Sequence, residues 1–292
     1  MTTRARATVN LPSHLDRRRF LAWASASAAW IAAHPGSALG SPGPASQPAE
    51  RLAAGPRILS LELLSAAPIS TMKEFYQGSL GLRVLDEQRD RLTLAAGLSS
   101  LTFVAAGPDA GEPFYHFAFN IPENKAVEAL AWQKERSPLM PIPRHLQDDD
   151  HPELVHFRHW NAHSVFFYDP AGNVVEYIAR HDLGNAAAGS FGSDDILYAS
   201  EIGLIVDEVA ATAAELKEVV GVEQYRGGDE QFTALGDERG LLLVMKRGRR
   251  LNFQPSDPAK AARVFRTAVR VHGLASTKYP LPGFPYELSV ER

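Results

Sequence analysis

The sequence predicts an α+β fold assembled from tandem units, each made of one strand, one helix and three more strands (βαβββ). Three observations predict it. Short apolar-rich segments with strand-like alternation recur along the chain, one helical pattern follows the first strand of each set, and the order repeats with a period of roughly fifty to sixty residues. One such unit leaves a sheet face uncovered. Two units side by side are therefore expected to form a curved mixed sheet around a cavity, with helices outside.

The first unit is expected to begin with a strand over Ile58–Ser65, where apolar and polar residues alternate. A helix is expected over Ile69–Leu80, closed by Gly81, because glycine readily adopts the left-handed conformation that ends helices. Three strands separated by turn residues complete the unit, at 83–87, 91–95 and 101–105.

The second unit repeats this order. A strand is expected over Tyr115–Ile121 and a helix over Glu123–Arg136, followed by a long polar loop that contains several prolines. Two strands, Ser164–Tyr168 and Asn173–Ala179, are then joined by the turn Asp169-Pro170-Ala171-Gly172, whose residue types favour a tight reversal of the chain.

A third unit is expected to run from Ile202 to Lys246, with its helix over Val209–Val220. The residues beyond it are too few for a complete fourth unit, although two more strand candidates occur among them. We expect residues 58–183 to form one domain of two paired units. Residues 184–292 are expected to hold the third unit and a degenerate partial fourth.

The first 40 residues (1–40) have the features of an export signal. Asp16-Arg17-Arg18-Arg19-Phe20-Leu21 is similar to a twin-arginine motif, a short Ala-rich apolar run follows, and Ala38-Leu39-Gly40 offers small residues for cleavage. Residues 41–57, rich in Pro, Gly, Ala and Ser, indicate a flexible linker. We expect export to the periplasm; the alternative is an arginine-rich start to an ordinary helix.

The composition limits the classes of partner and chemistry. The chain has 292 residues, a net charge of -4 and no cysteine, so disulfides, thiolate metal sites and a cysteine nucleophile are excluded. The charge gives no reason to expect a nucleic-acid partner, and no stable membrane span is expected after removal of the leader. The expected partner is a small molecule, and a homodimer is compatible with the sequence.

Three motifs of the first two units resemble one family. Phe75-Tyr76 is followed by Leu80-Gly81-Leu82, His116 lies in the strand Tyr115-His116-Phe117-Ala118-Phe119, and residues 167–176 read Phe-Tyr-Asp-Pro-Ala-Gly-Asn-Val-Val-Glu. Together they resemble the vicinal oxygen chelate superfamily, which includes glyoxalases, bleomycin-resistance proteins and extradiol dioxygenases. The resemblance covers 58–183 well and 199–247 less well. It implies a fold of βαβββ modules around a cavity.

The resemblance also implies that His116 and Glu176 bind a divalent metal ion. Strand alternation independently places His116 opposite the apolar Phe117 and Phe119, and therefore on the cavity face. An imidazole and a carboxylate on adjoining strands can hold iron, manganese, zinc or nickel, with open positions for a substrate.

The third ligand is where the sequence departs from the family, which supplies a histidine from the first strand of the first module. Here that strand has no histidine. By alternation Glu62 shares the cavity face with Ser60, so Glu62 is the expected third ligand and Ser60 is expected nearby without a direct bond. Glu201 occupies the matching place in the third unit, where an exposed strand residue is the simpler interpretation.

The histidines before the closing hairpin are candidates for catalysis. In extradiol dioxygenases a histidine near this point assists oxygen chemistry, which implies His159 or His163 as a general base, since the pKa of imidazole lies nearest neutrality. The alternative is a polar rim of the cavity. The family's tyrosine is replaced by Phe166. Phe166, Tyr168 and Asn120 are the candidate substrate contacts.

Two functions remain open from the sequence. The first is a metal-dependent enzyme that chelates two neighbouring oxygens of a small oxygenated molecule, aromatic molecules included, with dioxygenase-like or lyase/isomerase chemistry. The second is a metal-free protein of the same fold that sequesters a small molecule. The pair His116 and Glu176 favours the first function, whereas the missing histidine of the first strand favours the second.

Overall fold

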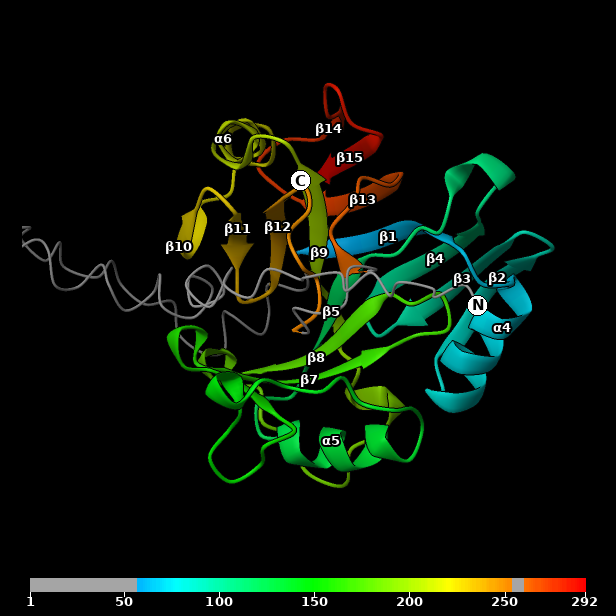
Figure 1. Cartoon of the computed structure of the whole chain (residues 1–292), viewed down its shortest axis with the longest axis vertical. Coiled ribbons are helices and arrows are strands. Elements are labelled where there is room, and N and C mark those ends of the chain that lie inside the picture. Colours follow the sequence, from blue (N-terminus) through cyan, green and yellow to red (C-terminus); the bar gives the residue numbers. More distant parts are fainter. Residues whose placement is uncertain (1–56, 254–259) are drawn as a thin grey trace, which may run out of the picture. The chain divides into compact units, whose positions relative to one another are not determined.

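Repeats of one strand order build two mixed sheets (Figure 1) in the computed structural model, which describes residues 57–253 and 260–292. The α+β fold with curved sheets and outer helices is therefore confirmed. The predicted export signal, and all but the last residue of the predicted linker, lie outside the described residues. None of the described helices is both long and apolar enough to cross a membrane.

The first sheet has seven strands in the order β14-β15-β13-β1-β4-β3-β2. Its strands are β1 (Ile58–Ser65), β2 (Arg83–Gln88), β3 (Arg91–Ala96), β4 (Ser99–Ala105), β13 (Thr267–His272), β14 (Thr277–Pro280) and β15 (Tyr286–Glu291).

The second sheet has eight strands in the order β10-β11-β12-β9-β5-β8-β7-β6. Its strands are β5 (His116–Ile121), β6 (Val155–Phe157), β7 (Ala162–Tyr168), β8 (Val174–Arg180), β9 (Tyr198–Val206), β10 (Gln224–Asp229), β11 (Phe232–Asp237) and β12 (Gly240–Lys246). The short strands β6 and β14 were not expected from the sequence.

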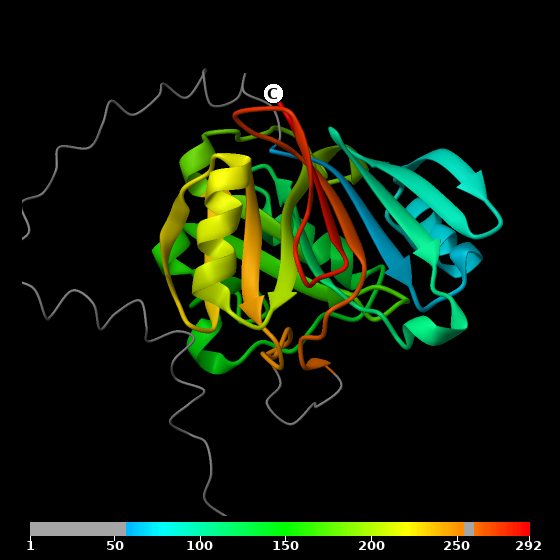
Figure 2. The ribbon, with the colours of Figure 1, turned by 90° about the horizontal axis from the view of Figure 1, so that it is seen from above.

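Each of the first three units contributes one main helix, seen at the periphery of Figures 1 and 2. These are α4 (Ile69–Lys73), α5 (Ala126–Lys134) and α6 (Val209–Val220). The first predicted helix changes character midway, since α4 continues as a π-helical turn, η1 (Glu74–Ser79). Short 3₁₀ turns complete the described elements: η2 (Pro108–Ala110), η3 (Arg144–Leu146), η4 (Arg158–Trp160), η5 (His181–Leu183) and η6 (Ser193–Asp195).

The pairing of units differs from the prediction. The first unit pairs with the fourth through antiparallel β1 and β13, and the second pairs with the third through antiparallel β5 and β9. In Figure 1 the C-terminal strands therefore lie beside the blue β1. The predicted pairing of the first two units is wrong. The opening strand of each unit lies at one edge of that unit and can pair with the opening strand of another unit. The repeat itself therefore does not specify which units pair.

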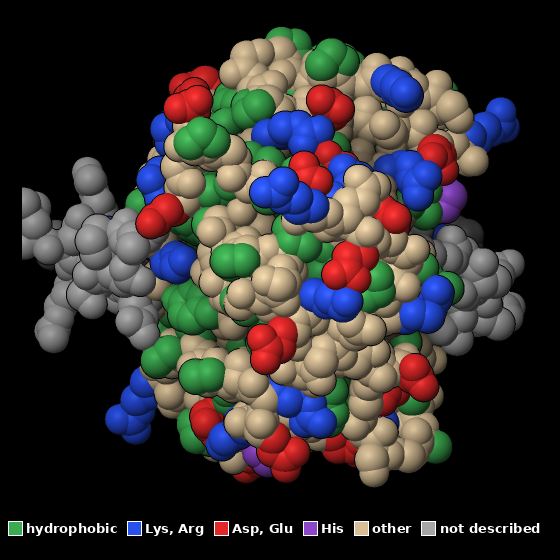
Figure 3. Space-filling model, turned by 90° about the vertical axis from the view of Figure 1, so that its right-hand side faces the viewer, with side chains coloured by type: hydrophobic (Ala, Val, Ile, Leu, Met, Phe, Trp, Pro, Cys, Tyr) green, Lys and Arg blue, Asp and Glu red, His purple; other side chains and the backbone are tan. Residues whose placement is uncertain are grey.

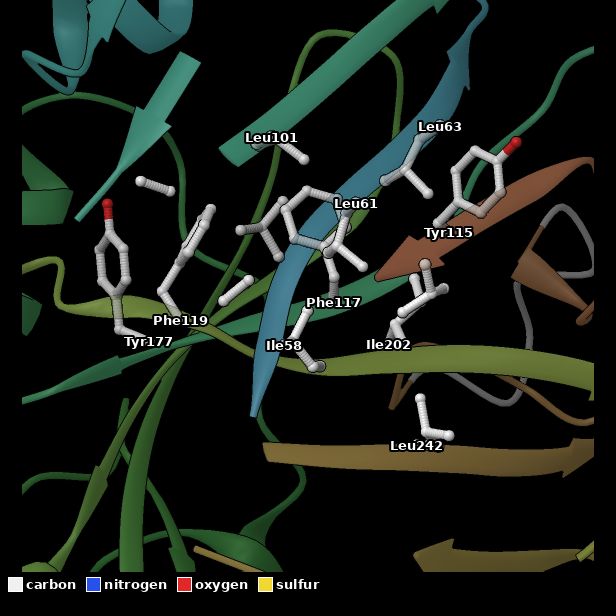
Figure 4. Packing of buried hydrophobic residues seen from close by; sticks show 14 of the residues in the cluster. Ile58, Leu61, Leu63, Leu101, Tyr115, Phe117, Phe119, Tyr177, Ile202 and Leu242 are labelled. Atoms are coloured by element: carbon white, nitrogen blue, oxygen red, sulfur yellow. The ribbon is translucent and has the colours of Figure 1, made fainter. Parts of the chain in front are cut away.

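A shared apolar core joins the two sheets (Figure 4). Leu61 and Leu63 of β1 pack in one cluster with Phe117 and Phe119 of β5, and all four are fully buried. Because successive strand residues point to opposite faces, the intervening residues of β1 and β5 point away from this core on opposite sides of the molecule. This geometry decides which polar residues can meet.

Two of the motifs noted in the sequence contact each other. The hydroxyl of Tyr76 donates to Asp169 Oδ2 at 2.8 Å, and both residues are buried. Asp169 also accepts the backbone N–H groups of Ala171 and Asn173 within the predicted turn, where Gly172 has φ +79°. A buried hydrogen bond thus joins the hairpin of β7 and β8 to the first helix.

On the face shown in Figure 3, acidic and basic side chains are interspersed, without a patch of a single sign.

Candidate metal centre

Three neighbouring strands bring His116, Glu176 and Glu201 together on the face of the second sheet that points away from the shared core. Strand β5 lies between β8 and β9, and Ala118 of β5 is opposite Glu176 on one side and Glu201 on the other. His116 is two residues earlier on the same strand, so its side chain shares their face. The small side chain of Ala118 leaves room for both carboxylates.

The three side chains converge on one point. His116 Nε2 lies 3.5 Å from Glu176 Oε2 and 3.7 Å from Glu201 Oε2. The other ring nitrogen, Nδ1, is 3.0 Å from the carbonyl oxygen of Val174, to which it can only donate a proton. In the neutral imidazole this bond leaves the lone pair on Nε2, directed at the carboxylates, as metal-binding histidines are held in other proteins.

Burial makes this cluster retain a proton. Glu176 and Glu201 are 2% and 1% exposed. Burial, and then the charge of Glu201, raise the pKa of Glu176 to about 8. Burial alone would lower the pKa of His116, but its hydrogen bond to Glu201 and the charges of both glutamates raise it above the usual value. Two carboxylates so close therefore need positive charge between them.

Arg180, on β8, holds one of the two carboxylates. It is fully buried, donates to Glu201 Oε1 through Nη2, and donates to Asn120 Oδ1 through Nε at 3.2 Å. The amide of Asn120 in turn donates to the hydroxyl of Tyr198 and the carbonyl of Glu238. The structure thus places Asn120, a predicted substrate contact, among protein partners that use its whole amide. It supports Arg180.

The donor set fits a divalent metal ion. The candidate ligand atoms of His116, Glu176 and Glu201 all lie within 4.8 Å of one another. Tetrahedral coordination with bonds of about 2.1 Å needs about 3.4 Å between ligand atoms, so small side-chain adjustments would suffice. Glu176 Oε1 is buried and meets no hydrogen-bond partner at normal geometry among the described residues, although the nearby Ser164 hydroxyl acts to lower the pKa of this carboxyl; an ion would supply a partner.

Glu62, the third ligand predicted from the sequence, does not join this cluster. Glu62 forms ion pairs with Arg91 at 2.6 Å and Arg266 at 2.8 Å, on the first sheet. Partial burial would raise its pKa, but the two guanidinium groups lower it below the usual value. With Ser60, Glu62 points away from the shared core on the side opposite His116. Glu201 lies beside His116 and Glu176, where Glu62 was expected. The sequence signal for this was that Glu201 matches Glu62 in the repeat.

The predicted catalytic histidines lie outside this cluster. His159 is exposed in η4, with Nε2 2.7 Å from the carbonyl oxygen of Arg226. His163 lies on β7, where Phe166 is paired with Glu176, and alternation therefore places His163 on the opposite face of the sheet from Glu176. No contact of either histidine with His116 is found in the described part of the chain.

The predicted aromatic contacts differ in their relation to the centre. The ring of Phe166 is nearly parallel to that of His116, with centroids 6.1 Å apart, so Phe166 forms one wall. Tyr168 accepts a hydrogen bond from Asn252 and lies under the Lys260 ammonium. The free space beside His116 is about 10 Å³, room for about one water molecule. It is lined by Phe114, Tyr115, Gly203, Ile205, Leu251 and Phe265.

Strand order within each complete unit gives the fold. In the first three units the opening strand pairs in parallel with the last strand, and the middle strands continue outward from it, after a single helix. This is the βαβββ order expected from the sequence, and it is consistent with modules of the vicinal oxygen chelate type. The α+β fold is thus confirmed, with the pairs of modules arranged as first with fourth and second with third.

Comparison with known proteins finds no match by sequence: no family model and no curated protein sequence matches the chain. Among solved structures, it is similar to a Bacillus subtilis protein named only provisionally as a dioxygenase (15% identity, 81% of this chain and 86% of that chain, TM-score 0.49). It is also similar to glyoxalase I from Zea mays (13%, 82% and 94%, 0.46) and to lactoylglutathione lyase from Agrobacterium tumefaciens (18%, 47% and 95%, 0.30).

Proposed function

We propose that this protein is a metal-dependent enzyme of the vicinal oxygen chelate type, in which His116, Glu176 and Glu201 hold one divalent ion. The observation that supports it most directly is the convergence of three buried donors, one of them with an unsatisfied oxygen. A bound ion would polarise two neighbouring oxygens of a small substrate and lower the cost of negative charge on them. The reaction would be dioxygenase-like, or a lyase or isomerase reaction.

The protein's own groups have distinct roles in this proposal. Val174 fixes the imidazole of His116 through its carbonyl oxygen, and Arg180 orients Glu201. Glu176 would hold the ion through Oε2, the oxygen nearest to His116 Nε2. Burial raises the pKa of Glu176 to about 8 in the metal-free centre, so this carboxyl holds a proton near neutral pH that must leave before the ion binds.

Bidentate chelation limits the substrate class. Two neighbouring oxygens must reach one ion, which favours small molecules such as 2-hydroxy acids or catechols. The space of about 10 Å³ beside His116 is lined by neither Glu176 nor Glu201, so it sets no size limit on a substrate at this centre.

Metal binding by matched variants tests this proposal. Glu176→Gln preserves shape and resembles the protonated residue, so the fold should persist while affinity for Mn²⁺ or Zn²⁺ at this site falls at least about tenfold. Glu62→Gln, at the ligand position expected from the sequence, should bind as the parent does. Titration calorimetry measures both.

Catechol or lactate should bind the metal-loaded parent and not the metal-free parent. Equal binding of either compound after chelation of the metal would sink the enzyme proposal.

Export to the periplasm is proposed from the leader alone. If Arg17 and Arg18 form a twin-arginine signal, replacing both with lysine should retain the protein in the cytoplasm. Cell fractionation of the double variant and its parent measures this, and unchanged export would reject the twin-arginine route.

A further inference from the structure

A second convergence of metal-binding side chains lies on the other face of β7. His156 of β6 is paired directly across from His163 of β7, and their rings stack with centroids 4.2 Å apart. Asp148, from the loop before β6, places Oδ2 3.2 Å from His163 Nε2 and 3.8 Å from His156 Nδ1. All three ligand atoms lie within 4.8 Å of one another.

The loop holds the aspartate in this orientation. Asp148 Oδ1 accepts the backbone N–H groups of Asp150 at 3.1 Å and His151 at 2.9 Å. The N–H of Asp148 donates to the carbonyl of Leu154, which closes the loop at its base. Because Oδ1 is occupied by the backbone, Oδ2 is the oxygen presented to the two histidines.

Hydrogen bonds orient His163 on both sides of its ring. Its Nδ1 lies 2.7 Å from His181 Nε2, and its Nε2 lies 3.2 Å from Asp148 Oδ2. In the metal-free protein a proton can lie between Nε2 and the carboxylate, and a metal ion would replace that proton. Metal-binding histidines in other proteins are oriented by such outer partners.

The third donor is unsatisfied. His156 Nδ1 is buried and has no hydrogen-bond partner among the described residues. His163 Nε2 and Asp148 Oδ2 are close enough to share a proton, and a cation bound among the three atoms would displace it and also supply a partner to His156 Nδ1. The separations of 3.2 and 3.8 Å are close to the value of about 3.4 Å that tetrahedral coordination requires.

We infer that Asp148, His156 and His163 form a second, independent site for a divalent transition metal of the imidazole-preferring class, represented by Zn²⁺, Ni²⁺ and Co²⁺. Asp148 and His163 also line a pocket of about 250 Å³, so water or a small anion can occupy the fourth position. The ion ties the loop and the short edge strand β6 to β7. The site shares no residue with the His116 centre.

Counting Zn²⁺ ions in matched variants of the full chain tests this inference. The parent should bind two ions, Asp148→Asn one, and the Asp148→Asn/Glu176→Gln double variant none, as measured by elemental analysis after gel filtration. Asparagine keeps the oxygen that accepts the loop N–H groups, so Asp148→Asn should match the parent in thermal stability with a chelator present. His181→Ala should weaken this ion about tenfold to a hundredfold, whereas His272→Ala, remote from the cluster, should change nothing.

The outcomes separate this site from the first one. If Asp148→Asn binds Zn²⁺ in the same number and with the same affinity as the parent, the second site is rejected, whatever Glu176→Gln does. If millimolar Zn²⁺ does not bind at Asp148 in the Glu176→Gln chain, His163 and Asp148 are joined by a hydrogen bond alone, and the inference is overturned. If the parent binds Zn²⁺ at Asp148 but not at His116, the proposed function is contradicted and this inference stands.

Discussion

Replacing the buried Arg180 with methionine is expected to lower the free energy of unfolding of the metal-free chain by about 3–5 kcal/mol. Arg180 is fully buried and neutralises Glu201, whose carboxylate lies beside Glu176. Methionine fills a similar volume but leaves the buried carboxylate of Glu201 without a permanent positive charge. Removing one partner of a buried ion pair is costly because the remaining charge cannot be hydrated.

A divalent ion should partly restore the stability of the Arg180→Met chain. If the ion binds between Glu176 and Glu201, it supplies the positive charge that the guanidinium no longer provides, and it binds the folded chain alone. Urea unfolding with and without Mn²⁺ measures both effects. Arg91→Met, which removes a half-exposed partner of Glu62, should cost less than about 1 kcal/mol and show no such rescue. Equal losses in the two variants would contradict this account of Arg180.

Raising the pH is expected to destabilise the metal-free chain and to strengthen metal binding. Burial and the charge of Glu201 raise the pKa of Glu176 from 4.5 to about 8, so the folded chain keeps a proton that the unfolded chain releases. Stability from this group is fully present below about pH 4.5 and is lost as pH rises through about 8. His116, whose pKa is also raised, changes stability in the same direction.

Metal affinity should follow the opposite trend, because the ion must displace this proton. The apparent affinity for Mn²⁺ should rise about tenfold per pH unit below pH 8 and level off above it. Chemical unfolding with a chelator, and Mn²⁺ titrations from pH 5 to 9, measure the two trends. In Glu176→Gln the stability should depend less on pH. If the stability of the metal-free parent instead rises from pH 5 to 8, Glu176 is ionised over this whole range.

The local signals in the sequence were sufficient for most elements. Alternation in Ile58–Ser65 and the residue types of the turn at 169–172 were enough, because strand faces and tight turns depend on neighbours in the chain. The edge strand β6 was missed for the converse reason. Its three residues have no pattern of their own, and they are extended because they pair with β7.

For the candidate site, alternation within β5 predicted that His116 faces away from the apolar core, and the resemblance of the hairpin motif predicted that Glu176 lies near it; the two side chains are indeed close. Only the tertiary structure decided which third side chain joins them. The second unit pairs with the third, so β9 places Glu201 beside His116, while β1 directs Glu62 away from the core on the opposite side. Partner choice between repeated units depends on contacts among distant strand edges, which no local pattern specifies.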